Sequence, residues 1–307
     1  MVPGCLPRFR DGLFSIVVFS ICFLILAQRP LTAQNKKPPG ESTQTIKVGS
    51  VQRSFIRYIP KGYDGSAAVP LVIVLHGRGG TAQQIENLTG FSTKADAENF
   101  IVVYPQAIGS PTVWNTGFTA VSANGADDMS FIREMLDRLQ HNFKIDPKRV
   151  YICGFSSGAI MSYYVGAQMS NRIAAMGIAA GFTGVKQPDG SLKQDPTPAG
   201  PVSAIVFHGK NDTTIFYTGG GSLVDCVSVA DSIAFWVHAD SCNARPHQTT
   251  KQNGNLIIDD YTQCSAGSEI ILRTFVNGTH EWPKMANNDH FDATDAVWDF
   301  FAAHPKP

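Results

Sequence analysis

The sequence has 307 residues, 43% of them hydrophobic, and its 25 basic and 25 acidic residues give a formal net charge of zero. This balance provides no electrostatic attraction for nucleic acid or for an anionic membrane surface, so we expect neither as a partner. The length suffices for one α/β domain with a large buried core after a targeting segment is removed.

The N-terminus is typical of an export signal. Arg8 and Arg10 precede an apolar run over residues 13–27, which is short for a membrane span and suits a signal peptide. We expect cleavage after Ala33, with cleavage after Ala27 or an uncleaved N-terminal anchor as alternatives. The protein is therefore expected to be secreted or periplasmic, with no stable membrane association after cleavage.

The chain is expected to divide into three segments. Residues 1–33 form the signal peptide, and residues 34–44 form a polar linker rich in Pro and Lys. Residues 45–307 form one folded domain, in which the sequence shows no internal repeat.

A glycine-rich loop follows the first strongly apolar strand. Residues 71–75 are a continuous apolar run, typical of a parallel strand buried on both faces. The run ends in His-Gly-Arg-Gly-Gly, which matches neither phosphate-binding pattern, G-x-G-x-x-G or Walker. We interpret it as an oxyanion loop, in which a backbone N–H after the His-Gly pair faces a reacting carbonyl oxygen. His76 is interpreted as a residue that holds this loop.

The next segment combines a helix, a strand and a long loop. A helix is expected over residues 93–99 and a buried strand over residues 100–104. In the loop that follows, Trp114 is equally consistent with a substrate wall and with an anchor of its own loop. Asp127 and Asp128 suit the N-cap and first turn of a helix that extends to Phe143.

The centre of the sequence is a Gly-x-Ser-x-Gly motif over residues 154–158. A strand-like run precedes it and a helix-like run follows it, which is the context of a nucleophile elbow. We interpret Ser156 as a nucleophile. Gly154 and Gly158 then stand where a side chain would keep strand and helix apart.

Strands and helices continue to alternate after the motif. This alternation predicts an α/β fold with a mostly parallel, doubly wound sheet between two layers of helices. A long irregular stretch is expected over residues 181–201. The sequence does not indicate whether this stretch acts as a lid over the site. The remaining elements are expected as helices over 159–169, 228–240 and 293–303, and as strands over 173–178, 202–207, 256–261 and 269–276.

Two polar residues follow later strands in the order that serine catalysis needs. A serine nucleophile requires a base and an acid that orients the base, both at the carboxyl ends of strands. Asp212 and His280 occupy such positions, and the order Ser156, Asp212, His280 is that of the α/β-hydrolases. His208 is interpreted as support for the turn at Asp212. Trp282 either lines the substrate pocket or packs in the core.

Six cysteines are present, two of them in the expected signal. Cys153 is expected to be a buried free thiol. Export permits a disulfide, and we favour the pair Cys242–Cys264, which leaves the state of Cys226 open. No cysteine or histidine spacing indicates a metal site.

Several stretches between Arg53 and Pro305 form one ordered set. They read Y-I-P-K-G-Y, L-H-G-R-G-G, F-I-V-V-Y-P, D-P-K-R-V-Y-I-C-G-F-S-S-G-A, H-G-K-N-D, T-H-E-W-P and F-D-A-T-D-A-V-W-D-F-F-A-A-H-P. Together these stretches resemble the secreted polyhydroxybutyrate depolymerase/feruloyl esterase family.

The resemblance implies an α/β-hydrolase catalytic domain with Ser156, Asp212 and His280 as its triad. It also implies an oxyanion hole formed by the N–H groups of Ser157 and Arg78, and in this family the two later cysteines commonly pair. The bulky Arg78, and Thr279 where glycine is usual, depart from the family pattern.

The sequence therefore predicts a serine esterase that needs no cofactor. The expected substrates are feruloyl, acetyl-xylan or hydroxyalkanoate esters, either small, polysaccharide-linked or oligomeric. The chain ends soon after the last helix, without the adsorption domain of many enzymes that act on solid polymer, which favours soluble esters. The alternatives are a polyester depolymerase proper, a non-catalytic binding protein on the same fold, and a peptidase.

Overall fold

A computed structural model describes residues 38–118, 125–221, 224–287 and 290–307, together with Met1 and Gly4. The expected signal peptide and its cleavage sites lie outside the described residues, apart from Met1 and Gly4. Within the described part of the chain, no helix is long and apolar enough to cross a membrane.

A ten-stranded sheet forms the middle of the domain, in the order β1-β2-β4-β3-β5-β6-β9-β12-β11-β10. The six strands from β4 to β12 in this order are parallel, and the two at each edge pair antiparallel. The strands are β1 Gly40–Val48, β2 Val51–Ile59, β3 Val69–Leu75, β4 Ile101–Pro105, β5 Ile145–Phe155, β6 Ala175–Ala179, β9 Ser203–Gly209, β10 His247–Lys251, β11 Leu256–Tyr261 and β12 Ile270–Phe275.

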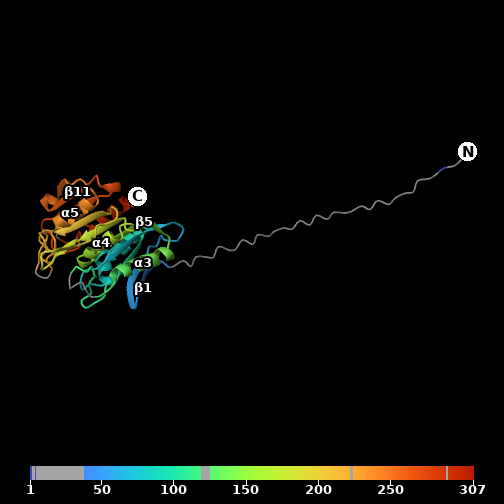
Figure 1. The fold of residues 1–307 in the computed structure, drawn as a ribbon, viewed down its shortest axis with the longest axis horizontal. Helices are drawn as coiled ribbons and strands as arrows, with labels where there is room; N and C mark the ends of the chain where they lie inside the picture. The colour runs from blue at the N-terminus through green and yellow to red at the C-terminus, as the bar shows by residue number, and fades with distance from the viewer. Residues whose placement is uncertain (2–3, 5–37, 119–124, 222–223, 288–289) are drawn as a thin grey trace. The chain divides into compact units, whose positions relative to one another are not determined.

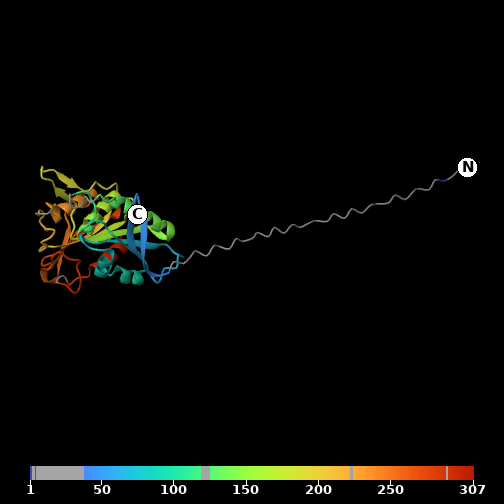
Figure 2. The same ribbon diagram turned by 90° about the horizontal axis from the view of Figure 1, so that it is seen from below.

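Helices cover both faces of this sheet (Figures 1 and 2). Apolar residues of α3, α4 and α5 pack in one core cluster, and those of α1, α2 and α6 pack in a second cluster on the opposite face. The helices are α1 Ala82–Thr89, α2 Phe91–Glu98, α3 Asp128–Asn142, α4 Ser157–Gln168, α5 Val229–Ala239 and α6 Ala293–Ala303. The predicted three-layer, mostly parallel α/β-hydrolase fold is confirmed.

The central strands are buried because both of their faces carry apolar side chains. All seven residues of β3 are buried, as a strand covered by helices on both sides requires. Its carboxyl end, and those of β5 and β9, lie at the same edge of the sheet because these strands are parallel. Loops that follow them therefore meet at one place.

The expected linker ends earlier than predicted. Strand β1 begins at Gly40 and pairs with β2 from Gly40–Ile59 onward, so the structure corrects the boundary of the folded domain from residue 45 to residue 40. Its side chains alternate between exposed and half-buried, because β1 is an edge strand. The polar composition that suggested a linker reflects this exposed position.

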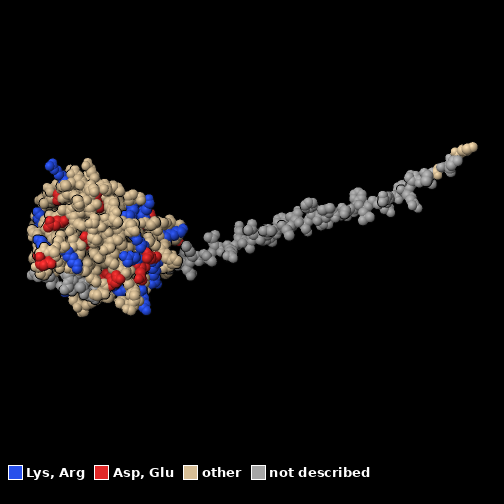
Figure 3. Space-filling model, viewed as in Figure 1, with Lys and Arg blue, Asp and Glu red and all other residues tan. Residues whose placement is uncertain are grey.

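Charged side chains are interspersed on the surface of the domain. On the face drawn in Figure 3, Lys and Arg lie among Asp and Glu without a large region of one sign. This distribution agrees with the zero formal net charge.

A disulfide joins Cys242 to Cys264, and Cys153 and Cys226 are free and buried. The bond links the residues after α5 to the segment between β11 and β12. This is the pair favoured from the sequence.

Replacing both Cys242 and Cys264 by Ser is expected to lower the free energy of unfolding by about 3 kcal/mol, because the crosslink limits the freedom of the unfolded chain. Urea denaturation followed by circular dichroism measures the change. Reductant should lower the midpoint of the wild type to that of the variant and leave the variant unaffected. An equal midpoint in oxidised wild type and variant would contradict the prediction.

Candidate active site

Ser156 occupies a sharp turn between β5 and α4. Its backbone angles are φ 56° and ψ −122°, a conformation that residues with side chains rarely adopt. The Ser156 N–H donates to the carbonyl of Ala179 at 2.9 Å, which fixes the turn to the neighbouring strand β6. The strained turn directs the hydroxyl away from the sheet, as the predicted nucleophile elbow requires.

The two motif glycines are needed for the close approach of strand and helix. A Cβ on Gly154 would overlap the backbone of Gly158, and a Cβ on Gly158 would overlap the carbonyl group of Leu75. In both cases the obstacle is backbone, which cannot rotate away. The steric role predicted for both glycines is confirmed.

Gly158→Ala is expected to lower the free energy of unfolding by about 3 kcal/mol, since the methyl group must displace β3 or α4. Gly200→Ala is the matched control, because no atom lies within 4 Å of a Cβ there. The free energy of unfolding of Gly200→Ala should stay within about 0.5 kcal/mol of the wild-type value. Urea denaturation of both variants measures the difference, and equal stabilities would contradict the packing argument.

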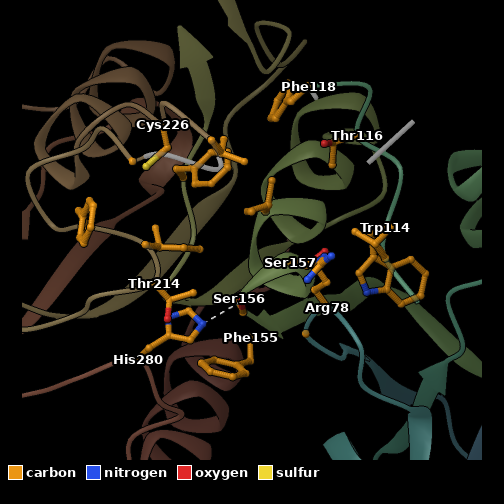
Figure 4. A pocket seen from close by; sticks show the side chains of 18 of the residues that line it. Arg78, Trp114, Thr116, Phe118, Phe155, Ser156, Ser157, Thr214, Cys226 and His280 are labelled. Atoms are coloured by element: carbon orange, nitrogen blue, oxygen red, sulfur yellow. Dashed lines mark hydrogen bonds between the residues drawn. The ribbon is translucent and has the colours of Figure 1, made fainter. Parts of the chain in front are cut away.

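His280 connects Ser156 to Asp212 by two hydrogen bonds (Figure 4). Its Nδ1 lies 2.8 Å from a carboxylate oxygen of Asp212, and its Nε2 lies 2.9 Å from the hydroxyl oxygen of Ser156. The carboxylate accepts only, so Nδ1–H donates to it and Nε2 accepts from the serine hydroxyl. The three predicted residues are therefore brought together in the protonation pattern that proton transfer from Ser156 needs.

Asp212 is held in the ionised state by its surroundings. Burial alone would raise the pKa of its carboxyl group, but hydrogen bonds from His208 and His280 outweigh burial and hold the pKa well below its ordinary value. The N–H groups of Thr214 and Ile215 both donate to its other oxygen at 2.8 Å. The acid is thus fixed in place as a carboxylate.

The two histidines interpreted as supports do hold loops. His208 Nε2 lies 2.9 Å from the carbonyl oxygen of Ile215 and 3.4 Å from Asp212. His76 donates from Nδ1 to the carbonyl of Gly77 at 2.8 Å and accepts from the N–H of Ala107 at 3.1 Å. Burial lowers the pKa of His76, so the ring stays neutral in this role.

The glycine-rich loop lies directly against Ser156. A Cβ on Gly77 would stand 3.3 Å from the Cβ of Ser156. The N–H of Gly79 donates to the carbonyl of Thr112 at 2.7 Å, and Gly79 adopts φ 74°, which favours glycine. The turn brings the backbone of Arg78 to the site, where Ser157 begins α4 with an N–H that its own helix cannot satisfy. That these two N–H groups bind an oxyanion stays a prediction.

A cavity of about 510 Å³ opens beside Ser156 and His280. Its walls are mainly apolar and come from the loops after β4, β6 and β9 and from α4 (Figure 4). The apolar lining residues include Val113, Phe118, Phe155, Ile160, Phe182, Ile215, Phe216, Val224 and Cys226. The cavity can accommodate an uncharged organic group next to the hydroxyl of Ser156.

The two predicted substrate-wall tryptophans have different positions. Trp114 lines the cavity, and its indole N–H donates to the carbonyl of His76 at 2.8 Å, so it anchors its loop; its contact with a substrate stays a prediction. Trp282 does not line the cavity. It is 1% exposed, packs in the core near Phe91 and donates to Thr294 at 3.2 Å. Of the two positions left open for Trp282, the core position is confirmed and the pocket role is wrong, because the chain after His280 turns into the core.

Several lining residues were not predicted from the sequence. Ile215 and Phe216 come three and four residues after Asp212, so their closeness to the acid in the sequence was an available signal. Val224 and Cys226 come from a loop outside the regular helices and strands. Its sequence has no periodic pattern from which its position in the fold could be predicted. Of the stretch 181–201, Phe182 reaches the lining, while the rest includes a small hairpin of β7 Gly184–Lys186 and β8 Leu192–Gln194.

The two acids before α3 have separate roles. Asp127 caps the helix by accepting from the N–H of Ser130, as predicted. Asp128 is buried and pairs with Arg53 at 2.6 Å, while its second oxygen accepts from the N–H of Asn115. It therefore anchors the loop that carries Trp114. Among the described residues, no group of three or more His, Cys, Asp or Glu could hold a metal ion.

Comparison with protein families gives a match over more than half of the chain. The matching family model is described as phospholipase/carboxylesterase and covers residues 64–228. The matched region includes Ser156 and Asp212 and ends before His280. The position of His280 beside these two residues is therefore known from the structure and not from the family match.

Curated relatives include two esterases that are longer than the region they share with this chain. Feruloyl esterase B of Piromyces equi is 29% identical over 236 residues, which cover 74% of this chain and 42% of that protein. Poly(3-hydroxyalkanoate) depolymerase C of Paucimonas lemoignei is 27% identical over 245 residues, which cover 69% of this chain and 57% of that protein. The chain thus spans about half the length of these two relatives.

Among solved structures, the acetyl xylan esterase from Aspergillus awamori is similar in fold. It superposes with a TM-score of 0.61 at 17% identity, covering 85% of this chain and 99% of that one. At this identity the likeness establishes the fold alone.

Proposed function

The chain belongs to the phospholipase/carboxylesterase family, and from this premise we propose that it is a serine hydrolase of carboxylic esters. The observation that carries the proposal is the hydrogen-bonded series from Asp212 through His280 to Ser156 at the edge of an apolar cavity. Ser156 is the nucleophile, His280 the base and Asp212 the acid that orients it.

Acylation begins when the hydroxyl oxygen of Ser156 attacks the ester carbonyl. His280 takes the hydroxyl proton at Nε2, and the carboxylate of Asp212 stabilises the imidazolium that forms. The N–H groups of Ser157 and Arg78 donate to the negative oxygen, and each such donor contributes about 3–4 kcal/mol in the transition state. His280 then gives its proton to the departing alcohol.

Deacylation repeats these steps with water. His280 takes a proton from the water as it attacks the acyl group, and the carboxylic acid leaves Ser156 with its hydroxyl restored. Every group in this scheme belongs to the protein or the substrate, so the reaction needs no cofactor.

The substrate class is an ester whose groups next to the reacting carbonyl are apolar or weakly polar. The apolar walls of the cavity support this, and relatives named as a feruloyl esterase and a poly(3-hydroxyalkanoate) depolymerase support aryl esters or hydroxyalkanoate oligomers. Rates of hydrolysis of methyl ferulate, acetylated xylo-oligosaccharides and hydroxybutyrate oligomers, compared under one set of conditions, separate the candidates. Faster release from solid polymer than from any soluble ester would favour a polyester depolymerase proper.

The second candidate is a binding protein on the same fold without catalysis. The alignment of Ser156 with His280 argues against it, because binding alone does not need this geometry. Hydrolysis of p-nitrophenyl butyrate, followed by absorbance, tests the difference. Absence of activity toward this and every other short ester would favour the binding protein.

We also propose that residues 1–33 are a signal peptide and that the mature protein is exported. The disulfide Cys242–Cys264 supports this, because such bonds persist in oxidising compartments. Sequencing the N-terminus of protein recovered outside the cytoplasm should give Gln34 as the first residue. An intact N-terminus on the purified protein would contradict cleavage.

A further inference from the structure

Arg78 places a cation at the rim of the cavity. Its backbone is fixed by the tight turn at Gly77–Gly80, in which the N–H of Gly80 donates to the carbonyl of Gly77 at 3.0 Å. Its side chain is exposed and lines the same cavity as Ser156 and Ser157 (Figure 4). The guanidinium group therefore faces the space that a bound ester would enter.

This guanidinium has no counter-ion within the described part of the chain. No carboxylate of a described residue forms an ion pair with Arg78, and the described lining of the cavity contains no Asp or Glu. Three other arginines are paired, namely Arg53 with Asp128, Arg149 with Asp146 and Arg172 with Asp137. Arg78 thus differs from them in keeping its donors available to a ligand.

The position of Arg78 relative to His280 indicates which part of a substrate it would meet. The departing alcohol must lie beside Nε2 of His280, which gives it a proton. In Figure 4, His280 lies on one side of Ser156 and Arg78 lies on the other. The carbonyl oxygen and the acyl part of the ester are then both directed away from His280, toward the side on which Arg78 lies.

Resting on the esterase function proposed above, we propose that Arg78 binds a carboxylate on the acyl part of the substrate. A guanidinium presents a planar set of donors that matches a carboxylate, and no other group of the described lining carries a permanent charge. The substrate class is the half-ester of a dicarboxylic acid, with the ester carbonyl at Ser156 and the free carboxylate at Arg78.

The test compares monomethyl and dimethyl esters of succinic, glutaric and adipic acids, which differ in charge and in the distance between the two ends. Alkaline titration of the released acid gives kcat/KM for each. For the best chain length, Arg78→Gln is expected to lower the ratio of monomethyl to dimethyl kcat/KM roughly tenfold, mainly through KM, because the carboxylate is remote from the reacting bond.

Two variants serve as comparisons. Arg78→Lys should retain part of the preference, because it keeps the charge and loses the fork of donors. Arg245→Gln removes an exposed cation outside the cavity and should keep the wild-type ratio. The preference should also weaken in high salt, since exposed charge pairs are screened.

Two results would overturn the inference. One is an unchanged ratio of monomethyl to dimethyl kcat/KM in Arg78→Gln. This includes the case in which both esters are hydrolysed more slowly by the same factor, because the side chain acts on the oxyanion itself. The other is a charge preference that appears only when the carboxylate is on the alcohol part, as with acetoxyacetate against its methyl ester.

A binding measurement keeps the inference separate from the esterase proposal. Calorimetry measures the affinity of monomethyl glutarate for the Ser156→Ala variant, which cannot hydrolyse this ester. The affinity should be at least fivefold lower in the double variant that also carries Arg78→Gln. If wild type hydrolyses no ester but this difference is found, the esterase proposal fails and the carboxylate site stands. If the difference is absent, the carboxylate site fails whatever the activity.

Discussion

Ser156→Ala is expected to lower kcat for p-nitrophenyl butyrate by about 10⁵- to 10⁶-fold, because no other group can form the acyl intermediate. The activity left should come from oxyanion binding and substrate positioning alone. The hydroxyl lies 2.9 Å from Nε2 of His280, so its removal also leaves the base without its proton donor. Initial rates of the purified variant measure the loss of activity. Its circular dichroism spectrum checks that the fold is intact.

Ser157→Ala is the matched comparison for this variant. Ser157 is the other serine of the motif and begins α4, so only its backbone N–H has a part in the proposed reaction. Alanine keeps that N–H, and the variant should retain activity within about tenfold of wild type. A loss as large as that of Ser156→Ala would mean that the nucleophile has been misassigned.

Asp212→Asn is expected to lower kcat by about 10⁴-fold. The amide N–H₂ of asparagine would face Nδ1 of His280 and would have to donate to it. The ring would then carry its proton on Nε2, where it can no longer accept from Ser156. The N–H groups of Thr214 and Ile215 can still bond the remaining oxygen, so the fold should survive and the loss should be catalytic.

Asp189→Asn provides the control for this loss of charge. Asp189 lies in the β7–β8 hairpin, where it accepts from the N–H of Ser191, and it does not line the cavity. The variant should keep the wild-type rate. Comparable losses in Asp189→Asn and Asp212→Asn would show that the effect arises from net charge and not from the orientation of His280.

The arrangement of the site could be predicted from the sequence because its parts follow buried parallel strands. Ser156, Asp212 and the loop at Arg78 each come directly after such a strand, and parallel strands bring their carboxyl ends to one edge. His280 follows the strand-like run that became β12, next to β9 in the sheet. Strand periodicity and order were therefore enough to bring these residues together.

The parts that the sequence did not predict depend on contacts between distant residues. Trp282 follows His280 by two positions, yet its ring enters the core against Phe91, which sequence distance cannot indicate. Helix α1 has only eight residues, and its few apolar side chains were not enough to establish a helical period from the sequence. The edge strands β1 and β10 are polar because one or both of their faces are exposed, and polar composition alone resembles a linker or loop.

The most direct test of the central claim is covalent labelling of the nucleophile. A fluorophosphonate should react once with the wild-type protein, because the oxygen of Ser156 displaces fluoride from phosphorus when His280 removes its proton. Mass spectrometry of the digested protein should find the adduct on the peptide that contains Ser156 and none on Ser156→Ala. An adduct on a different residue, or full esterase activity in protein that carries the adduct on Ser156, would contradict the account.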